Sequence, residues 1–261
     1  MFCSGSRLHN DDVFQNVRAY TKLAMLSDQE RRLCGNVFRY PMKITEVPTS
    51  ERLIKTNMLV EKNGILEFAA PYLCSLYMQE RWGSTDRAKE APKDFKTFLM
   101  DTFTVMDPKA LQNSFGVGKD KRLLERTWQM EFYRAATKVL PNTIYISPDV
   151  GADFGSRGFV DFFVDDNRGW VIELLRDGEK AEDHEKRFKS NGIYSNILRC
   201  SVESVIIDIR NASLSPPAVK RTGWMYVYCH KGWESVTIEY KDIKEVIKLI
   251  SHSRSLLEQG S

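Results

Sequence analysis

The spacing of apolar residues changes along the chain from a helical period to a strand period, and these changes predict its elements. In the first part, apolar residues recur at helical intervals over residues 13–25, 28–34 and 51–60. Asn63-Gly64 then lies between two short apolar arms in residues 60–68, which is a strong local signal for a β-hairpin. The pattern therefore predicts helices, a hairpin and a further helix up to about residue 82.

The second part alternates helices and strands. Leu124, Trp128 and Phe132 fall on one face of a predicted helix over residues 123–140. After this helix, apolar runs bounded by turn residues predict strands, and more polar stretches separate them. The predicted elements are a strand over 143–147, two strands joined by a turn at 165–169, a polar helix over 179–188, a strand over 204–210, a hairpin over 224–240 and a closing helix over 243–257.

Turn-forming residues are concentrated between these two patterns, around a short apolar helix expected over residues 95–103. We therefore predict a domain over 11–85, a linker region over 86–121 and a larger domain over 122–258, with an α/β (α+β) fold class. The order helix, helix, hairpin, helix in the first domain resembles a winged helix-turn-helix. Its basic residues would then contact DNA, and a purely structural lid is the alternative; these residues are Arg39, Lys43, Arg52, Lys55 and Lys62.

Two acids, Asp161 and Glu173, stand inside apolar strand-like runs in the segment GFVDFFVDDNRGWVIELLRDGEKAEDHEKRF. A buried carboxylate is costly unless it is protonated, hydrogen-bonded or held by a cation. The turn at 165–169 makes the two strands antiparallel neighbours, so both acids can bind one ion. Their hard oxygen ligands suit Mg²⁺ or Mn²⁺. The alternative is that each acid forms a structural salt bridge with Arg157, Arg168 or Arg176.

A strand with Asp, a hairpin and a strand with Glu resemble the core of the restriction-endonuclease-like fold with its PD-(D/E)xK motif. The continuation ELLRDGEKAEDHEKRF…GIY is similar to the nuclease-type C-terminal domain of Crinkler effectors, which filamentous eukaryotic microbes deliver into host cells. The similarity covers residues 123–250 and is most specific over 158–194. It implies an αβββαβ core followed by a hairpin and a helix, and a Mg²⁺-dependent nuclease that acts on double-stranded DNA.

The same resemblance implies further site residues. Members of the fold place a glutamate of the preceding helix near the metal, which here corresponds to Glu131, and an exposed glutamate is the alternative reading. The motif lysine is absent, because Leu175 stands at its position. Replacement cations are Arg176, next to it in sequence, and Lys180 and His184, which share a helical face with Arg187 or Phe188. His184 would deliver a proton or hold a phosphate, or else be a surface imidazole.

Composition narrows the partners only slightly. The chain has 38 basic and 35 acidic residues and a net charge of +3, so any nucleic-acid surface must be a local patch. Five cysteines without a CxxC pair argue against a zinc ribbon or a disulfide framework. No apolar run is long enough for a membrane span, and no secretory signal pattern opens the chain. If the protein is an effector, we expect its delivery segment to be missing or to lie outside this sequence. The aromatic residues Tyr145, Phe154, Tyr194 and Trp224 are candidates for base stacking, and core packing explains most of them equally well.

Two classes of function compete. The first is a nuclease of a Crinkler-like virulence effector, secreted by the producing microbe and active in the host nucleus, or an intracellular nuclear enzyme if it is not an effector. The second is a catalytically silent nuclease fold that binds DNA or host nuclear proteins, which the missing lysine favours; self-association is left open. A kinase is disfavoured because the chain has neither a GxGxxG loop nor an HRD-type loop, and the absence of GxSxG disfavours a serine hydrolase.

Overall fold

The computed structural model describes residues 23–39, 42–44, 50–83, 86–112, 125–151, 154–213, 216–230 and 232–249. The chain forms two compact units, residues 1–81 and 82–261. Most of the helix predicted over 13–25, and the end of the helix predicted over 243–257, lie outside the described residues. None of the helices within the described ranges is both long and apolar enough to cross a membrane.

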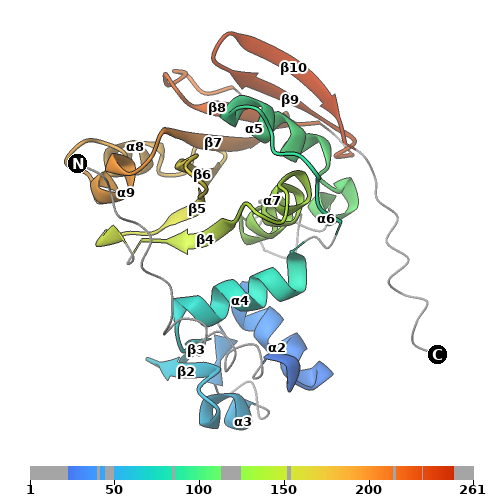
Figure 1. The fold of residues 1–261 in the computed structure, drawn as a ribbon, viewed down its shortest axis with the longest axis vertical. Helices are drawn as coiled ribbons and strands as arrows, with labels where there is room; N and C mark the ends of the chain where they lie inside the picture. The colour runs from blue at the N-terminus through green and yellow to red at the C-terminus, as the bar shows by residue number, and fades with distance from the viewer. Residues whose placement is uncertain are drawn as a thin grey trace. The chain divides into compact units, whose positions relative to one another are not determined.

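The first unit combines helices with a small antiparallel sheet (Figure 1). Its predicted hairpin is confirmed, because β2 and β3 pair around Asn63 and Gly64, whose φ angles are 55° and 78°. Positive φ at both turn residues matches the right-handed twist of a hairpin, which is why Asn-Gly is favoured there. The sheet order is β1-β3-β2. The elements are α2 (Asp28–Arg39), β1 (Met42–Lys43), α3 (Ser50–Lys55), β2 (Leu59–Lys62), β3 (Ile65–Phe68) and α4 (Pro71–Trp82).

A capping box starts helix α2. Glu30 Oε2 accepts hydrogen bonds from the Ser27 backbone N–H at 2.8 Å and from Ser27 Oγ at 2.9 Å, and Ser27 Oγ accepts one from the Glu30 N–H at 3.3 Å. Arg52 of α3 donates to the same Glu30 oxygen at 2.9 Å. The cap therefore satisfies free helix-end N–H groups and also joins two helices.

A mixed sheet of seven strands forms the centre of the second unit, in the order β10-β9-β8-β7-β6-β5-β4. β6 is parallel to β7 and β7 to β8, whereas the other neighbouring pairs are antiparallel. The strands are β4 (Ile146–Val150), β5 (Val160–Val164), β6 (Trp170–Arg176), β7 (Glu203–Asn211), β8 (Met225–Cys229), β9 (Ser235–Tyr240) and β10 (Ile243–Lys248). The helices are α5 (Phe95–Thr104), α6 (Pro108–Gln112), α7 (Glu125–Val139), α8 (Ala181–Arg187) and α9 (Ser195–Arg199).

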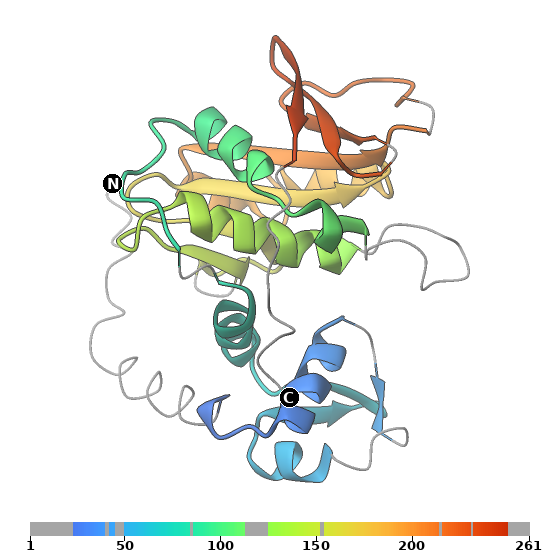
Figure 2. The same cartoon turned by 90° about the vertical axis from the view of Figure 1, so that its right-hand side faces the viewer.

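Helices cover both faces of this sheet (Figure 2). On one face, Phe132 of α7 stacks on Phe162 with ring centroids 5.3 Å apart, and Phe98 of α5 stacks on Trp170 at 5.3 Å. On the other face, Val171 packs in a cluster that includes Ile197 of α9. The second unit is therefore a mixed α+β fold with its core in the strands between two helical layers.

The closing helix predicted over 243–257 is wrong within its described part, because residues 243–248 form strand β10. Ile243, Val246 and Ile247 have a spacing that fits a helix. The tight turn at Lys241, with φ 53°, instead folds this segment back along β9, with which it makes six antiparallel residue pairs. Tertiary strand pairing thus overrides local spacing. The predicted strand over 143–147 is also displaced, since β4 is Ile146–Val150.

The helix predicted over 95–103 is confirmed as α5, which runs from residue 95 to 104. Phe95, Phe98 and Phe103 are fully or almost fully buried, and both Phe95 and Phe98 stack on Trp170. The described part of the segment predicted as a linker, residues 86–112, therefore belongs to the second unit. The helix contributes to its core.

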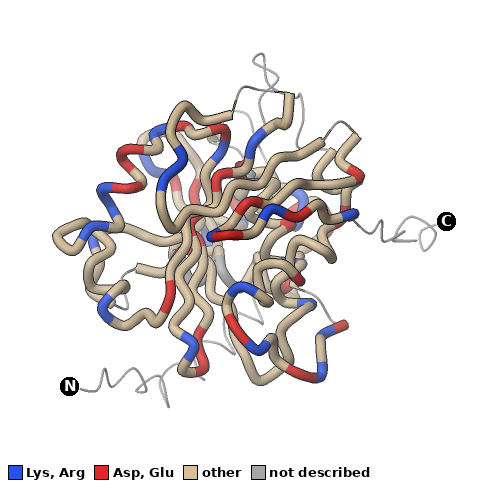
Figure 3. Tube along the Cα trace, turned by 90° about the horizontal axis from the view of Figure 1, so that it is seen from above, with Lys and Arg blue, Asp and Glu red and all other residues tan. Residues whose placement is uncertain are grey.

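Basic and acidic residues are interspersed along the described chain (Figure 3). In the first unit, three of the basic residues predicted to contact DNA have acidic partners: Arg52 pairs with Glu30 at 2.9 Å, Lys55 with Glu51 at 3.5 Å and Lys62 with Glu67 at 3.8 Å. These partners reduce the local positive potential that a phosphate would meet.

Candidate active site

The pairing of β5 with β6 brings the two strand acids together. Phe162 is opposite Ile172, and the same register extended by one residue places Asp161 opposite Glu173. Directly opposite residues project from the same face of a sheet. The Leu174 N–H donates to Asp161 Oδ2 at 2.6 Å, so the Asp161 side chain bonds the neighbouring strand where the backbone ladder ends.

Asp161 is partly buried, and both of its oxygens accept a hydrogen bond. Besides the Leu174 N–H, the Gln129 side-chain amide of α7 donates to Oδ1 at 2.7 Å. Burial, together with the charge of Glu173, raises the pKa of Asp161 well above its usual range, and the Leu174 hydrogen bond opposes this shift. Without a cation, this carboxyl group therefore keeps its proton to a higher pH than an ordinary aspartate does.

Glu173 is only 3% exposed, and its two oxygens have very different surroundings. Oε1 lies 2.8 Å from His184 Nδ1, 3.3 Å from Arg187 Nη1 and 3.2 Å from the Tyr194 hydroxyl. Oε2 is buried without a hydrogen-bond partner among the described residues. A buried carboxylate oxygen without a partner is costly, and a cation at Oε2 would remove that cost.

Two more acids act on this pair. Burial raises the pKa of Asp149, at the end of β4; Arg126, 3.7 Å away, opposes this shift and Glu173 adds to it. Glu125, the first residue of α7, has an exposed surface, but the surrounding protein still partly desolvates its carboxyl group. This desolvation raises the pKa of Glu125, and the nearby His184 opposes the shift. The acids of β4, β5, β6 and α7 are thus close enough to affect one another electrostatically.

The residues fit a hard divalent cation that keeps part of its hydration shell. Asp161 and Glu173 would provide carboxylate oxygens, and Mg²⁺ commonly uses only one or two of these. Within the described residues, no group of three or more His, Cys, Asp and Glu side chains is arranged to hold an ion by itself. The remaining ligands would therefore be water and substrate oxygens.

Of the other predicted site residues, the structure brings only His184 directly to the acid pair. Glu131 accepts hydrogen bonds from Arg134 and from the Asp107 N–H at 2.6 Å, so it forms a buried structural ion pair elsewhere on α7. Arg176 pairs with Glu179 at 2.5 Å. Lys180 is exposed at the start of α8 with φ 53°.

Leu175, at the position of the motif lysine, is 2% exposed. It packs in an apolar cluster with Ile206, Trp224 and Tyr226. Glu173 nonetheless pairs with the guanidinium of Arg187 and contacts His184; both residues belong to α8, and neither is one of the arginines proposed for a structural salt bridge, Arg157, Arg168 and Arg176. A cation of the following helix, Arg187, therefore lies beside Glu173 where the strand has no lysine.

Three residues around the acids were not selected as catalytic residues. Arg187 was weighed as a replacement cation, with Phe188 as the alternative on the helix face of His184, and the three-residue spacing was the available signal. Gln129 lies two residues before Glu131, and its amide is uncharged, so the sequence did not distinguish it. Tyr194 was proposed for base stacking but is only 1% exposed, and its hydroxyl bonds Glu173.

Base stacking is also excluded for Trp224, which is 7% exposed, whereas Phe154 packs on Phe163 at 5.1 Å. Of the four aromatic residues proposed, Tyr145 is well exposed, at 61%.

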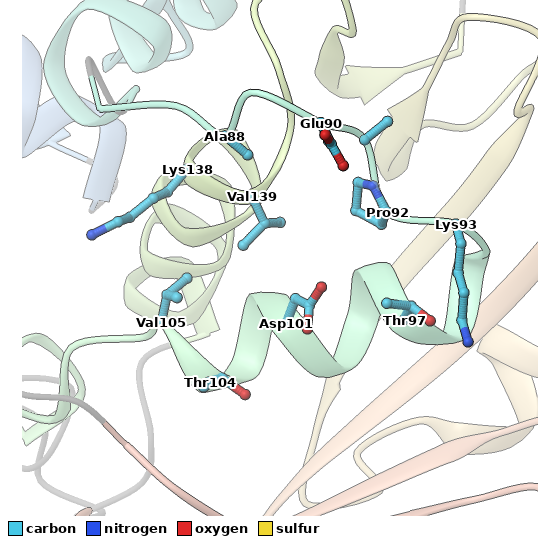
Figure 4. A pocket seen from close by; sticks show the side chains of 11 residues that line it. Ala88, Glu90, Pro92, Lys93, Thr97, Asp101, Thr104, Val105, Lys138 and Val139 are labelled. Carbon is cyan, nitrogen blue, oxygen red and sulfur yellow. The ribbon is translucent and has the colours of Figure 1, made fainter.

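A separate surface cavity of about 470 Å³ lies between α5, the end of α7 and the loop before α5 (Figure 4). Glu90 and Asp101 contribute acidic groups to it, and Lys93 and Lys138 basic ones. Burial and Asp94 raise the pKa of Asp101. Its lining shares no residue with the acid pair; the remaining lining residues are Ala88, Ala91, Pro92, Thr97, Thr104, Val105 and Val139.

Comparison with known proteins gives no relative. No family model matches the chain, and neither a curated protein nor a solved structure matches it.

Proposed function

We propose that the second unit is a metal-dependent nuclease of the restriction-endonuclease type that hydrolyses DNA phosphodiester bonds. The observation that carries this proposal is Glu173 Oε2, a buried oxygen without a described hydrogen-bond partner, on the residue paired with Asp161. A buried carboxylate oxygen without a hydrogen bond is costly, and a cation bound at Oε2 would remove that cost.

The order of elements supports the same proposal. Helix α7 precedes three antiparallel strands, β4, β5 and β6, and helices α8 and α9 then lead to β7, which is parallel to β6. This order is compatible with the αβββαβ core that the sequence resemblance implied, with two short helices between β6 and β7. Asp161 and Glu173 stand on its second and third strands, where the motif places its acids.

In the proposed mechanism, Asp161 and Glu173 would hold Mg²⁺ or Mn²⁺, which when bound would supply Lewis-acid polarisation of the phosphate and activation of water. Gln129 and the Leu174 N–H orient Asp161, and Tyr194 and His184 orient Glu173. Arg187, 34% exposed, extends from Glu173 towards solvent. Its permanently protonated guanidinium cannot act as a base, so it would stabilise negative charge that develops on the phosphate.

The test is cleavage of plasmid DNA by the full chain with Mg²⁺ or Mn²⁺. Asp161→Asn and Glu173→Gln should each reduce the cleavage rate by roughly 100-fold or more, because each removes a carboxylate from the proposed ion. Asp183→Asn is the matched control, since this carboxylate on α8 is 59% exposed and pairs only with Lys186 among the described ion pairs. Unchanged cleavage in Asp161→Asn would remove the assignment.

The second candidate is a silent nuclease fold that binds DNA or a host nuclear protein. The burial of Leu175 favours it, because the strand offers no lysine to the acid pair. It predicts a complex with duplex DNA that weakens steeply as salt rises, and no cleavage with any divalent ion. Cleavage that depends on Asp161 would eliminate this candidate.

The wider biological role is proposed from the Crinkler resemblance. On this proposal the protein is an effector of a filamentous microbe, acts in the host nucleus, and uses its first unit as a winged helix. The α2, α3, β2, β3 order and the β1-β3-β2 sheet are compatible with that motif. A fluorescent fusion expressed in host cells should accumulate in the nucleus, and exclusion from it would count against this role.

A further inference from the structure

Two large apolar side chains are exposed close to the acid pair. Phe159 is 47% exposed and Ile193 is 43% exposed. Phe159 is two residues before Asp161, a distance of at most about 7 Å along the chain. Ile193 precedes Tyr194, whose hydroxyl reaches Glu173. The pair is thus continuous with the candidate active site.

Hydrogen bonds fix the backbone on which these side chains stand. The Tyr194 hydroxyl lies 2.7 Å from the carbonyl oxygen of Phe159 and 3.2 Å from Glu173 Oε1, so one phenol connects the exposed aromatic residue to the candidate ligand. Ser156 Oγ donates to the Ile193 carbonyl at 2.5 Å. The apolar pair is therefore held in place at the site.

Two glycines provide the space in which the side chains of Phe159 and Ile193 lie. A Cβ at Gly158 would lie 2.5 Å from Ile193 Cδ1, and a Cβ at Gly151 would lie 2.9 Å from Phe159 Cδ1 and 2.2 Å from the Gly158 carbonyl oxygen. Ile193 thus packs over the Gly158 backbone, and the Phe159 ring lies against Gly151. An apolar surface that is rigid and still exposed suits a flat ligand.

We propose that Phe159, supported by Ile193, stacks on an unpaired base next to the scissile phosphate, so that the preferred substrate is single-stranded nucleic acid or a duplex with an unpaired segment. The inference rests on the proposed nuclease function. Glu173 is recessed and Phe159 is exposed, so a strand whose phosphate reaches the acids places its base near the ring. Arg157, exposed two residues before Phe159, provides a cation for the adjoining phosphate.

The test measures binding of the full chain to a single-stranded oligonucleotide and to its blunt duplex, by fluorescence anisotropy in EDTA. Phe159→Ala should weaken single-strand binding by about 5- to 100-fold and leave duplex binding within about twofold, because stacking on an aromatic ring requires an unpaired base. Phe159→Trp should retain the binding. Val219→Ala, at a side chain that is 75% exposed, is the control. A 2-aminopurine base in the strand should be quenched by the wild-type protein and not by Phe159→Ala.

Equal effects of Phe159→Ala on both oligonucleotides, no effect on either, or no binding of the single strand by the wild-type protein would overturn the inference. Cleavage of the same oligonucleotides with Mn²⁺ separates it from the proposed function. If cleavage depends on Asp161 while Phe159→Ala changes nothing, the nuclease assignment stands and the stacking surface falls. If single-strand binding depends on Phe159 without any cleavage, the nuclease assignment falls and the stacking surface stands. The melting temperature of each variant verifies folding.

Discussion

The two oxygens of Glu173 show how one residue can combine structure with chemistry. Oε1 lies within hydrogen-bond reach of three side chains that fix the carboxylate, whereas Oε2 has no such partner among the described residues. Fixing one oxygen removes the rotational freedom of the group, so binding at the other loses less entropy. The sequence cannot show this difference between the two oxygens, because it depends on side chains of α8 and of the segment after α8.

At the residue scale, the raised pKa of Asp161 has a consequence for stability. The native state holds a proton that the unfolded chain releases above its usual pKa of about 4. Without metal, the free energy of unfolding should therefore fall as pH rises from about 4 through the raised pKa. Asp161→Asn should make this slope shallower, because the other carboxyl groups with raised pKa values still contribute to it, and Asp183→Asn should leave it unchanged. Urea unfolding at a series of pH values in EDTA measures it; identical slopes in Asp161→Asn and the wild type would contradict the prediction.

A second residue-scale prediction concerns metal. Mn²⁺ that binds only the native state should raise the free energy of unfolding of the wild type by about 2.7 kcal/mol at 100 times its dissociation constant. Asp161→Asn should lose most of this gain, because it removes one of the two proposed carboxylates. Thermal melting with and without Mn²⁺ measures the effect. Equal stabilisation of both proteins would place the ion elsewhere.

At the element scale, the capping box of α2 should make the first unit sensitive to acid. Burial alone would raise the pKa of Glu30, but the Ser27 hydrogen bonds and Arg52 outweigh it and lower the pKa. This stabilisation is present above the unfolded pKa of about 4.3 and is lost as pH falls through the lower folded pKa. Glu30→Gln should destabilise α2 by about 1 kcal/mol at pH 7, and the difference should disappear in acid.

Amide hydrogen exchange of α2, followed by mass spectrometry, measures this change. Glu51→Gln is a suitable control, because the Glu51 side chain is 81% exposed. A Glu30→Gln difference that persists unchanged at low pH would show that the carboxylate charge is not responsible.

The β2–β3 turn allows a separate prediction. Gly64 has φ 78°, and a Cβ there would meet nothing within 4 Å. Gly64→Ala should therefore destabilise the first unit by about 1 to 2 kcal/mol through backbone strain alone. Gly223→Ala, at φ 79° and equally open space, should have a similar local penalty in the second unit. Urea unfolding detects both changes; no loss in Gly64→Ala would argue against the left-handed turn.

Elements whose signal is local were predictable from the sequence. The Asn63-Gly64 hairpin, the turn between β5 and β6, and α5 are all where the pattern placed them. Strand β10 was not, because Ile243, Val246 and Ile247 fit a helix as well as a strand, and its partner β9 decides between them. The acids Asp161 and Glu173 could be selected because a charge within an apolar run needs an explanation.

At the scale of the whole molecule, the segment predicted as a linker contributes to a core. Phe95 and Phe98 of α5 both stack on Trp170, which is 4% exposed. A chain of residues 82–261 should therefore fold by itself, whereas one of residues 122–261 would expose Trp170. The longer chain should melt cooperatively, and the shorter one should bind hydrophobic dye or aggregate.

The Phe98→Ala substitution in the full chain should lower the free energy of unfolding by about 3–5 kcal/mol. Cooperative melting of the chain of residues 122–261 would contradict the prediction that the second unit needs α5 to fold.

The burial of Leu175 also has a consequence for sequence searches that use the motif and for attempts to reintroduce its lysine. An ammonium group introduced there by Leu175→Lys would be enclosed by Ile206, Trp224 and Tyr226. Restoring the motif lysine should therefore destabilise the fold instead of producing activity. A search that requires the lysine would discard this chain. A more suitable query would join the aspartate and glutamate to the histidine and arginine three residues apart on the next helix, His184 and Arg187.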